Sequence, residues 1–398
     1  MTRTRRAPQA CSRLVLGALA GLGLLVWLPG QAEAADWYNA SWASRKKITI
    51  DKSKVSGTQT DFPVLINLTT DTDLAADAQD DGDDLLFTSS DGATKLSHEL
   101  EKFDGTTGQL VAWVKVPSLS SSTNTVLYLY YGNAGATNQQ SATAVWDANY
   151  KGVWHLKEGT SGTDSIKDST SNAHSGTPAA GVALNTTGLA NGAASFDADN
   201  EVIDVTDHLD FDFASNNVTV SAWVKTVSNT IYKPIVEHYI GGSPGSGWYL
   251  DVDANNSPYG AGVLFFEHRN TSGVGKAITS VGRADNDQWH YAVVTITSTG
   301  TAKMYLDGVL ENTDATFTSL NNGNETLKIG DLDGAGGYYG QGPLDEIRIS
   351  NGIARSAGWI TTEYNNQGSP STFYSVGGEA SVGNVRFDGV RMESLQVY

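Results

Sequence analysis

The chain has 398 residues and a formal net charge of −18 at neutral pH, from 44 acidic and 26 basic side chains. An acidic excess of this size disfavours nucleic acid and anionic membrane surfaces as partners, because both repel negative charge. The single cysteine, Cys11, lies near the N-terminus. The rest of the chain therefore has no disulfide to rely on, and its stability has to come from a buried core.

Residues 1–34 have the organisation of a secretory signal peptide. Arginines precede an apolar stretch from Leu14 to Leu28, which is followed by the small-residue sequence Ala32-Glu33-Ala34. This stretch is shorter than the about 20 apolar residues of a transmembrane helix, so we interpret it as a leader that is cleaved after Ala34. We expect a secreted or cell-surface protein with no membrane insertion after cleavage.

After the leader, short runs of alternating apolar and polar residues recur, with turn residues between them. Asp307-Gly308 is the clearest two-residue hairpin turn. The runs are Lys46–Ile50, Pro63–Leu68, Leu110–Val116, Thr125–Tyr131, Val218–Lys225, His290–Thr297, Ala302–Leu306 and Asp345–Ile349. This pattern predicts an all-β protein built from antiparallel β-sandwiches.

Composition divides the mature chain into two domains of ordinary size. A polar stretch rich in Asn, Gln, Ala and Gly begins at Gly132, and residues 134–150 are interpreted as a linker. It separates a first β-sandwich domain, 35–133, from a larger second domain, 151–376. Residues 377–398 form a C-terminal extension, either an added hairpin or a remnant of a further module.

The second domain contains an ordered series of motifs that resembles LamG-like (laminin G-like) modules of the concanavalin A-like superfamily. These motifs are Val153-Trp154-His155-Leu156, Asp168-Ser169-Thr170-Ser171-Asn172, Gly192-Ala193-Ala194-Ser195-Phe196-Asp197, Val218–Val224, Gln288-Trp289-His290, Met304–Gly308 and Gly342–Ile349. The resemblance implies that the second domain is a jelly roll.

The first domain resembles an uncharacterised β domain that is common ahead of LamG-like modules in bacterial surface and secreted proteins. The motifs are Trp42 with Arg45–Ile50, Phe62-Pro63-Val64-Leu65, Asp83–Phe87, Ala112–Pro117 and Leu127–Gly132. This family implies no activity and supports only an extracellular location.

Catalytic residues are not expected. Glycosidases of the superfamily carry a Glu-x-Asp-x-x-Glu run, which this sequence lacks, and retaining enzymes hold two carboxylates about 5 to 5.5 Å apart. Strand alternation would send Asp345 and Glu346 to opposite faces of a sheet. The histidines form no close pair at the spacing of zinc ligands. We therefore expect a binding protein rather than an enzyme.

Calcium is the cofactor that the resemblance implies. Related domains often hold one ion where an early Asp-Ser loop meets a late strand, and the matching residues here are Asp164, Asp168, Asn172 and Asp345. Their oxygen atoms are ligands that calcium prefers. The alternative is that 168–172 is an Asx-type turn and that Asp345 is a turn or strand-edge residue.

Aromatic residues in Gly-rich loops are the candidate contacts to a ligand, because an exposed ring can stack on a sugar. The candidates are Trp248, Tyr259, Tyr338 and Tyr339. They favour a noncatalytic binding or adhesion protein that recognises a polysaccharide or glycoprotein. Two alternatives stay open: a polysaccharide-degrading hydrolase or its accessory module, and a structural surface spacer.

Overall fold

The computed structural model describes residues 36–382, except 199, 214–216, 242–244, 318–324 and 333–337. The predicted signal peptide lies outside the described residues, as do residues 383–398 of the predicted C-terminal extension. Within the described part of the chain, no helix is long and apolar enough to cross a membrane.

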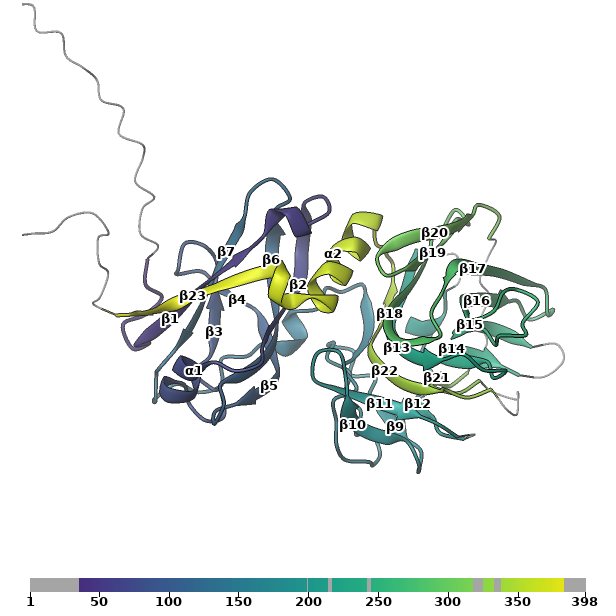
Figure 1. The fold of residues 1–398 in the computed structure, drawn as a ribbon, viewed down its shortest axis with the longest axis horizontal. Coiled ribbons are helices and arrows are strands. Elements are labelled where there is room, and N and C mark those ends of the chain that lie inside the picture. The colour runs from purple at the N-terminus through teal and green to yellow at the C-terminus, as the bar shows by residue number, and fades with distance from the viewer. Residues whose placement is uncertain are drawn as a thin grey trace, which may run out of the picture. The chain divides into compact units, whose positions relative to one another are not determined.

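The first sandwich is formed by a three-stranded and a five-stranded antiparallel sheet (Figure 1). The smaller sheet has the order β2 (Gln59–Leu68), β6 (Gln109–Leu119) and β5 (His98–Asp104). The larger has the order β23 (Tyr374–Ser381), β1 (Ser44–Ile50), β7 (Thr125–Tyr131), β3 (Leu86–Thr88) and β4 (Lys95–Leu96). Alternating apolar residues of both sheets, such as Ile48, Val64 and Val114, form its core. A short helix, α1 (Thr72–Asp77), and a 3-10 turn, η1 (Lys52–Lys54), lie between strands.

The second sandwich has an eight-stranded and a seven-stranded sheet. The first, sheet C, has the order β10 (Ala183–Thr187), β11 (Gly192–Phe196), β22 (Gly342–Asn351), β13 (Val218–Val227), β18 (Asn286–Ile296), β19 (Ala302–Leu306) and β20 (Val309–Asp314), and β8 (Tyr150–Trp154) also pairs with β22. The second, sheet D, has the order β17 (Gly275–Arg283), β16 (Val263–Arg269), β15 (Ser246–Val252), β14 (Lys233–Ile240), β21 (Leu327–Ile329), β12 (Ile203–Val205) and β9 (Gly176–Pro178). The prediction of an all-β protein with two antiparallel sandwiches is confirmed.

The C-terminal part of the chain returns to the first sandwich. β23 pairs along its length with β1, so the yellow and purple strands lie side by side in Figure 1. Two helices, α2 (Ala357–Gly368) and α3 (Pro370–Phe373), lead into it. Trp359 of α2 packs on Phe62 with ring centroids 4.7 Å apart. β23 thus completes a sheet of the first sandwich, and α2 packs on both sandwiches, with Trp359 in the core of the first and Ile360 against Trp223 of the second.

Residues of the expected linker are buried where the two sandwiches meet. Val145 and Trp146 join Trp113 of β6 and Val153 of β8 in one apolar cluster. The 3-10 turn η2 (Ala142–Ala144) precedes them. Burial of a large aromatic side chain stabilises strongly, so this half of the segment fixes the sandwiches to each other rather than joining them loosely.

A buried ionic network crosses the same interface. The Arg348 guanidinium of β22 lies 2.7 Å from a carboxylate oxygen of Glu346 and 3.1 Å from one of Glu363 on α2. Its Cζ atom lies 4.4 Å from the ring centre of Trp113, in the first sandwich. A charge taken out of water is tolerated only when it is paired and hydrogen-bonded, and Arg348 has two carboxylates and an aromatic face.

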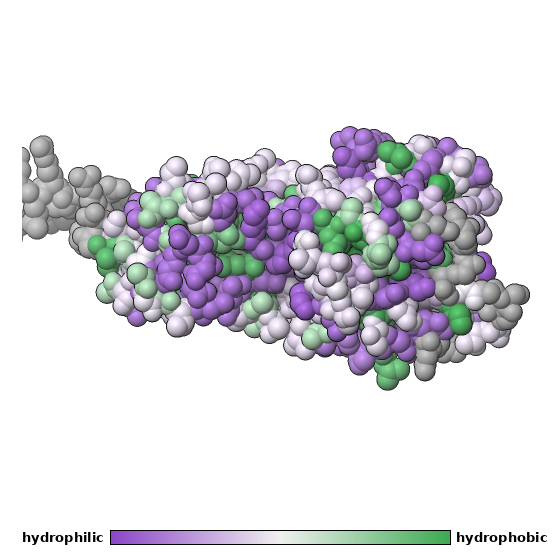
Figure 2. Space-filling view, turned by 90° about the horizontal axis from the view of Figure 1, so that it is seen from below, coloured by the Kyte–Doolittle hydropathy of each residue, from purple (hydrophilic) through white to green (hydrophobic). Residues whose placement is uncertain are grey.

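The surface offers little continuous apolar area on the face that Figure 2 shows. Hydrophilic residues cover most of its described part, and the apolar ones form small separate patches. Single exposed apolar side chains, such as Leu209 and Val281, are ordinary for a folded protein. This face therefore offers no flat apolar patch large enough to suggest a binding surface.

Replacing Arg348 by methionine should destabilise the protein by about 3–5 kcal/mol, because the buried carboxylates lose their counter-charge. Urea-induced unfolding measures the loss, and methionine keeps much of the apolar contact with Trp113. The control is Lys225→Met, which removes an exposed ion pair with Asp287 and should cost no more than about 1 kcal/mol. Equal effects of the two variants would contradict this role for Arg348.

Candidate functional site

The candidate site is a cavity of about 160 Å³ in the second sandwich, which we call the tyrosine–carboxylate pocket. Aromatic rings and carboxyl groups dominate its lining. The lining residues are Tyr232, Tyr249, Asp251, Asp253, Tyr259, Phe265, Glu267, Arg269, Leu332 and Tyr338. A mixed aromatic and polar lining of this kind is typical of small-molecule sites.

Strand alternation places these side chains on one face of sheet D. In β15, Trp248 and Leu250 belong to the sandwich core, so Tyr249 and Asp251 point to the opposite face. β16 pairs with β15 in a register that sets Tyr249 opposite Glu267. Asp251 is only 2% exposed although it faces away from the core, so the loops around the sheet edge roof this face and turn it into a pocket.

The aromatic side chains line the pocket in two groups. Phe265 stacks on Tyr249 at 5.8 Å and contacts Tyr259 at 4.8 Å between ring centres. Tyr232 and Tyr338 form a second stack, at 4.7 Å and 22° between ring planes. Tyr259 is 57% exposed and is the most accessible of these rings. The pocket thus offers one open aromatic face beside two ring pairs that support it.

Glu267 is held in a fixed position at the bottom of this face. The Tyr249 hydroxyl donates to Glu267 Oε2 at 2.6 Å, and Arg269 Nε lies 3.0 Å from Oε1. Burial, together with the neighbouring carboxylates, raises the pKa of Tyr249 far above its usual value. The tyrosine therefore stays a hydrogen-bond donor, and both oxygens of Glu267 are already engaged.

Asp251 and Asp253 are the two carboxyl groups of the pocket whose pKa burial raises most plainly. Asp251 Oδ1 has no hydrogen-bond partner among the described residues. Burial, followed by the charge of Asp253, raises the pKa of Asp251 well above its usual value. Burial also raises the pKa of Asp253 to about 6, even though Ser257 donates to it at 2.8 Å. A buried, unpaired polar atom costs about 1–3 kcal/mol, which the pocket recovers only when a ligand supplies the missing partner.

A second, larger hollow shares Tyr259 with this pocket. Its volume is about 430 Å³, and it is lined by residues of β17 and β20. These residues are Tyr259, Ala277, Ile278, Thr279, Asn312, Thr313, Asp314 and Ala315. Because Tyr259 belongs to both linings, one extended ligand can contact both hollows.

The four aromatic residues predicted as ligand contacts have different outcomes. Tyr259 and Tyr338 line the pocket, whereas the half-buried Tyr339 is not part of its lining. Trp248 is fully buried, and its Nε1 donates to Phe211 O at 3.0 Å. Placing Trp248 at a ligand contact was therefore wrong, because strand alternation turns it into the core.

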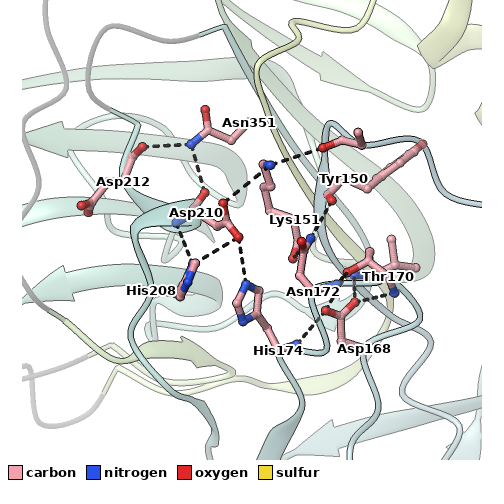
Figure 3. A network of polar contacts seen from close by, with 12 residues as sticks. Tyr150, Lys151, Asp168, Thr170, Asn172, His174, His208, Asp210, Asp212 and Asn351 are labelled. Carbon is pink, nitrogen blue, oxygen red and sulfur yellow. Dashed lines mark hydrogen bonds and ion pairs between the residues drawn. The ribbon is translucent and has the colours of Figure 1, made fainter. Parts of the chain in front are cut away.

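The calcium ligands implied by the family resemblance do not come together. Both carboxylate oxygens of Asp168 already accept hydrogen bonds from neighbouring protein groups (Figure 3). Oδ1 accepts from Val153 N and Thr170 N, and Oδ2 accepts from Thr170 Oγ1 and His174 N. Asn172 Nδ2 donates to Tyr150 O, while Asp345 Oδ2 accepts from Leu189 N. No group of three ligand-type side chains found in the described residues includes Asp164, Asp168 or Asp345. These residues do not fit a calcium ion, and 168–172 has the hydrogen bonds of a side-chain-stabilised turn.

Asp345 and Glu346 do not alternate across the sheet as expected. Glu346 has a φ of 52°, and the register between β13 and β22 shifts at this point. This bulge directs Glu346 towards His155, 2.7 Å away, on the side of the sheet where Arg348 lies. A bulge inserts one residue and cancels the strict alternation, which explains why the prediction was wrong.

His155 and its carboxylate neighbours form a closed cluster rather than an open site. The atoms of Glu101, His155 and Glu346 that could bind a metal ion lie within 4.8 Å of one another. Although burial alone would lower it, the charges of Glu346, Glu99 and Glu101 raise the pKa of His155 well above its usual value. Burial raises the pKa of Glu101 to about 7. His155 and Glu346 are each 1% exposed, so the cluster joins the sandwiches and has no room for a substrate.

Comparison with protein families places known domains on both sandwiches. Residues 197–361 match the Laminin_G_3 family, described as the concanavalin A-like lectin/glucanases superfamily. Residues 81–163 match DUF2341, a domain of unknown function. The chain therefore carries a concanavalin A-like domain preceded by a DUF2341 domain, which confirms the resemblance seen in the sequence.

Solved structures similar to this chain include three toxin domains. The binding domain of Paraclostridial Mosquitocidal Protein 1 aligns with a TM-score of 0.44 and 15% identity, over 54% of this chain and 52% of that one. The binding domain of botulinum neurotoxin serotype G gives 0.42 and 15%, over 54% and 50%. That of serotype D gives 0.42 and 15%, over 57% and 53%. The chain spans about half the length of these proteins, and a comparison with curated proteins gave no match.

Asp168→Ala should destabilise the protein equally in calcium and in chelator. The substitution removes a carboxylate that accepts four hydrogen bonds in its loop, with an expected cost of about 2–4 kcal/mol. Thermal unfolding under the two conditions measures it. A loss that appears only with calcium present would show that Asp168 is a metal ligand after all.

Asp253→Asn should make stability less dependent on pH. The pKa of Asp253 is about 6 in the fold against 3.8 for a free side chain, so its contribution to stability is present below about pH 4 and is lost as the pH rises through 6. Asparagine does not titrate. The variant should therefore lose less unfolding free energy than the parent between these pH values, and the exposed Asp287→Asn serves as the control. Identical pH profiles for Asp253→Asn and the parent would contradict the assignment.

Proposed function

We propose that this chain is a secreted or cell-surface protein that binds carbohydrate, free or on a glycoprotein, in the tyrosine–carboxylate pocket without catalysing a reaction. One observation carries the proposal: Asp251 Oδ1, which lines the pocket, is buried and has no partner among the described residues. The signal-peptide pattern of residues 1–34 supports export, and the concanavalin A-like domain at 197–361 supports a lectin or glucanase scaffold.

A hydroxyl-rich ligand suits the unpaired oxygen. A sugar hydroxyl can donate to Asp251 Oδ1 and can also accept a hydrogen bond, which matches a carboxyl group whose pKa is raised by burial. The carboxyl groups of Asp253 and Glu267 line the same space. Because these carboxylates repel anions, the preferred ligand is a neutral glycan rather than a uronic acid or a sulfated sugar.

The rings give the pocket a surface that sugars recognise. Tyr259 presents an open face, and aromatic side chains combine a large apolar area with fixed geometry. A pocket of about 160 Å³ is too small for a long chain, but a second hollow of about 430 Å³ shares Tyr259 with it. We infer an oligosaccharide whose terminal sugar enters the pocket while the next sugars lie across Tyr259.

A hydrolase is the second candidate, and the same pocket favours it. Glycosidases use one carboxyl group that keeps its proton beside a second that is ionised. Asp251, with its raised pKa, lies in one pocket with Glu267, whose oxygens accept from Tyr249 and interact with Arg269. Binding stays the first choice because both oxygens of Glu267 are engaged and neither is free to attack a sugar.

Binding should weaken about tenfold in Tyr259→Ala and in Asp251→Asn, because each variant removes one direct contact of the sugar. The ligand is first selected on an array of neutral and acidic oligosaccharides, and its Kd is then measured by calorimetry. Tyr339→Ala is the matched control, since this neighbour of Tyr338 does not line the pocket.

Three results would count against the proposal. Absence of binding to any glycan would favour a structural spacer, and equal loss in Tyr339→Ala would place the ligand elsewhere. Release of reducing ends from the bound glycan, abolished in Glu267→Gln, would establish the hydrolase instead.

A further inference from the structure

A second cluster with ligand-binding chemistry is formed by His174, His208 and Asp210 of the second sandwich, none of which lines the pocket. His174 Nε2 lies 3.0 Å from Asp210 Oδ2, and His208 Nδ1 lies 3.1 Å from the same oxygen (Figure 3). The two imidazole rings are 4.5 Å apart between centres. The fold therefore brings together two histidines that are 34 positions apart in the sequence, although the spacing of the histidines along the chain gave no sign of such a pair.

The separations between these three atoms suit a metal ion. A tetrahedral ion with bonds of about 2.0–2.1 Å to nitrogen and oxygen holds its ligand atoms about 3.3 Å apart. All three donor atoms lie within 4.8 Å of one another, and two of the spacings, 3.0 and 3.1 Å, need to open only slightly. Two imidazoles and one carboxylate favour zinc or a similar transition metal over calcium.

The surrounding residues hold the cluster in place. Asp168 Oδ2 accepts from the backbone N–H of His174 at 2.8 Å, and Trp154 Nε1 donates to His174 O at 2.8 Å. The amide of Asn351 donates to Asp210 O, which fixes the 3-10 turn η3 (Leu209–Phe211). Figure 3 shows Asn351, Lys151, His174 and His208 around Asp210. Such outer contacts orient metal ligands and are worth about 10–100-fold in affinity.

The cluster is also accessible from solution. The exposed fraction is 51% for the His208 side chain, 23% for Asp210 and 13% for His174. An ion can therefore enter, and at least one coordination position would face water. The alternative is a pair of ordinary ion pairs between histidine and Asp210, with Lys151 Nζ at 3.6 Å adding positive charge.

We propose that His174 Nε2, His208 Nδ1 and Asp210 Oδ2 bind one divalent transition-metal ion, for which Zn²⁺ is the probe, with an open position for water or a partner's ligand. Binding replaces one existing contact, the hydrogen bond from Asp210 N–H to His208 Nδ1. Lys151 then pairs with the second oxygen of Asp210, which stays outside the coordination shell. This site is independent of the proposed carbohydrate pocket.

Calorimetric titration of Zn²⁺ into tag-free, chelator-treated protein tests the proposal. We expect one ion per chain at about pH 7.5. His208→Ala, chosen because its side chain is the most exposed, and Asp210→Asn should each weaken binding by about 100-fold or more.

The control is His290→Ala, which removes a histidine that pairs with Asp307 but has no second histidine in its group among the described residues. Thermal unfolding in chelator confirms that each variant folds. Retained binding in His208→Ala, equal loss in His290→Ala, or no binding to the parent would each overturn the proposal. Carbohydrate affinity should be the same in His208→Ala and the parent, so the two proposals fail separately.

Discussion

The packing of the two sandwiches against each other depends on Arg348. Its guanidinium joins a carboxylate of its own strand to Glu363 on α2, and its flat face lies on Trp113 of the other sandwich. The outer face of sheet C is therefore covered by the first sandwich and by α2. The outer face of sheet D is not covered in this way, and the tyrosine–carboxylate pocket lies on it. The interface thus determines which side of the concanavalin A-like domain can meet a ligand.

The buried carboxyl groups of the pocket lower the stability of the fold. This loss of stability is the main reason to regard the pocket as functional. Asp251 and Asp253 are 2% and 1% exposed, and their pKa values are raised chiefly by burial. Lys233 is buried near them, and burial lowers its pKa despite these acidic neighbours. Apolar residues at these positions would stabilise the sandwich more. Groups that weaken a fold in this way are common where a ligand is bound.

The sequence predicted most of what depends on local pattern. The hairpin at Asp307-Gly308 was expected, and both residues have the positive φ of a tight turn between β19 and β20. Alternation along β15 places Trp248 in the core and its neighbour Tyr249 in the pocket, a distinction that the glycine-rich context alone did not make. The bulge at Glu346 and the meeting of His174 with Asp210 could not be predicted, because both depend on contacts between distant segments rather than on any local period. The same holds for β23, whose partner lies at the opposite end of the chain.

The most direct test is a crystal structure of the protein with a neutral oligosaccharide that it binds in solution. The account predicts density for a sugar ring against Tyr259, with a hydroxyl within hydrogen-bond distance of Asp251 Oδ1. A sugar bound elsewhere, with Asp251 still unpaired and the pocket filled by other groups, would contradict it.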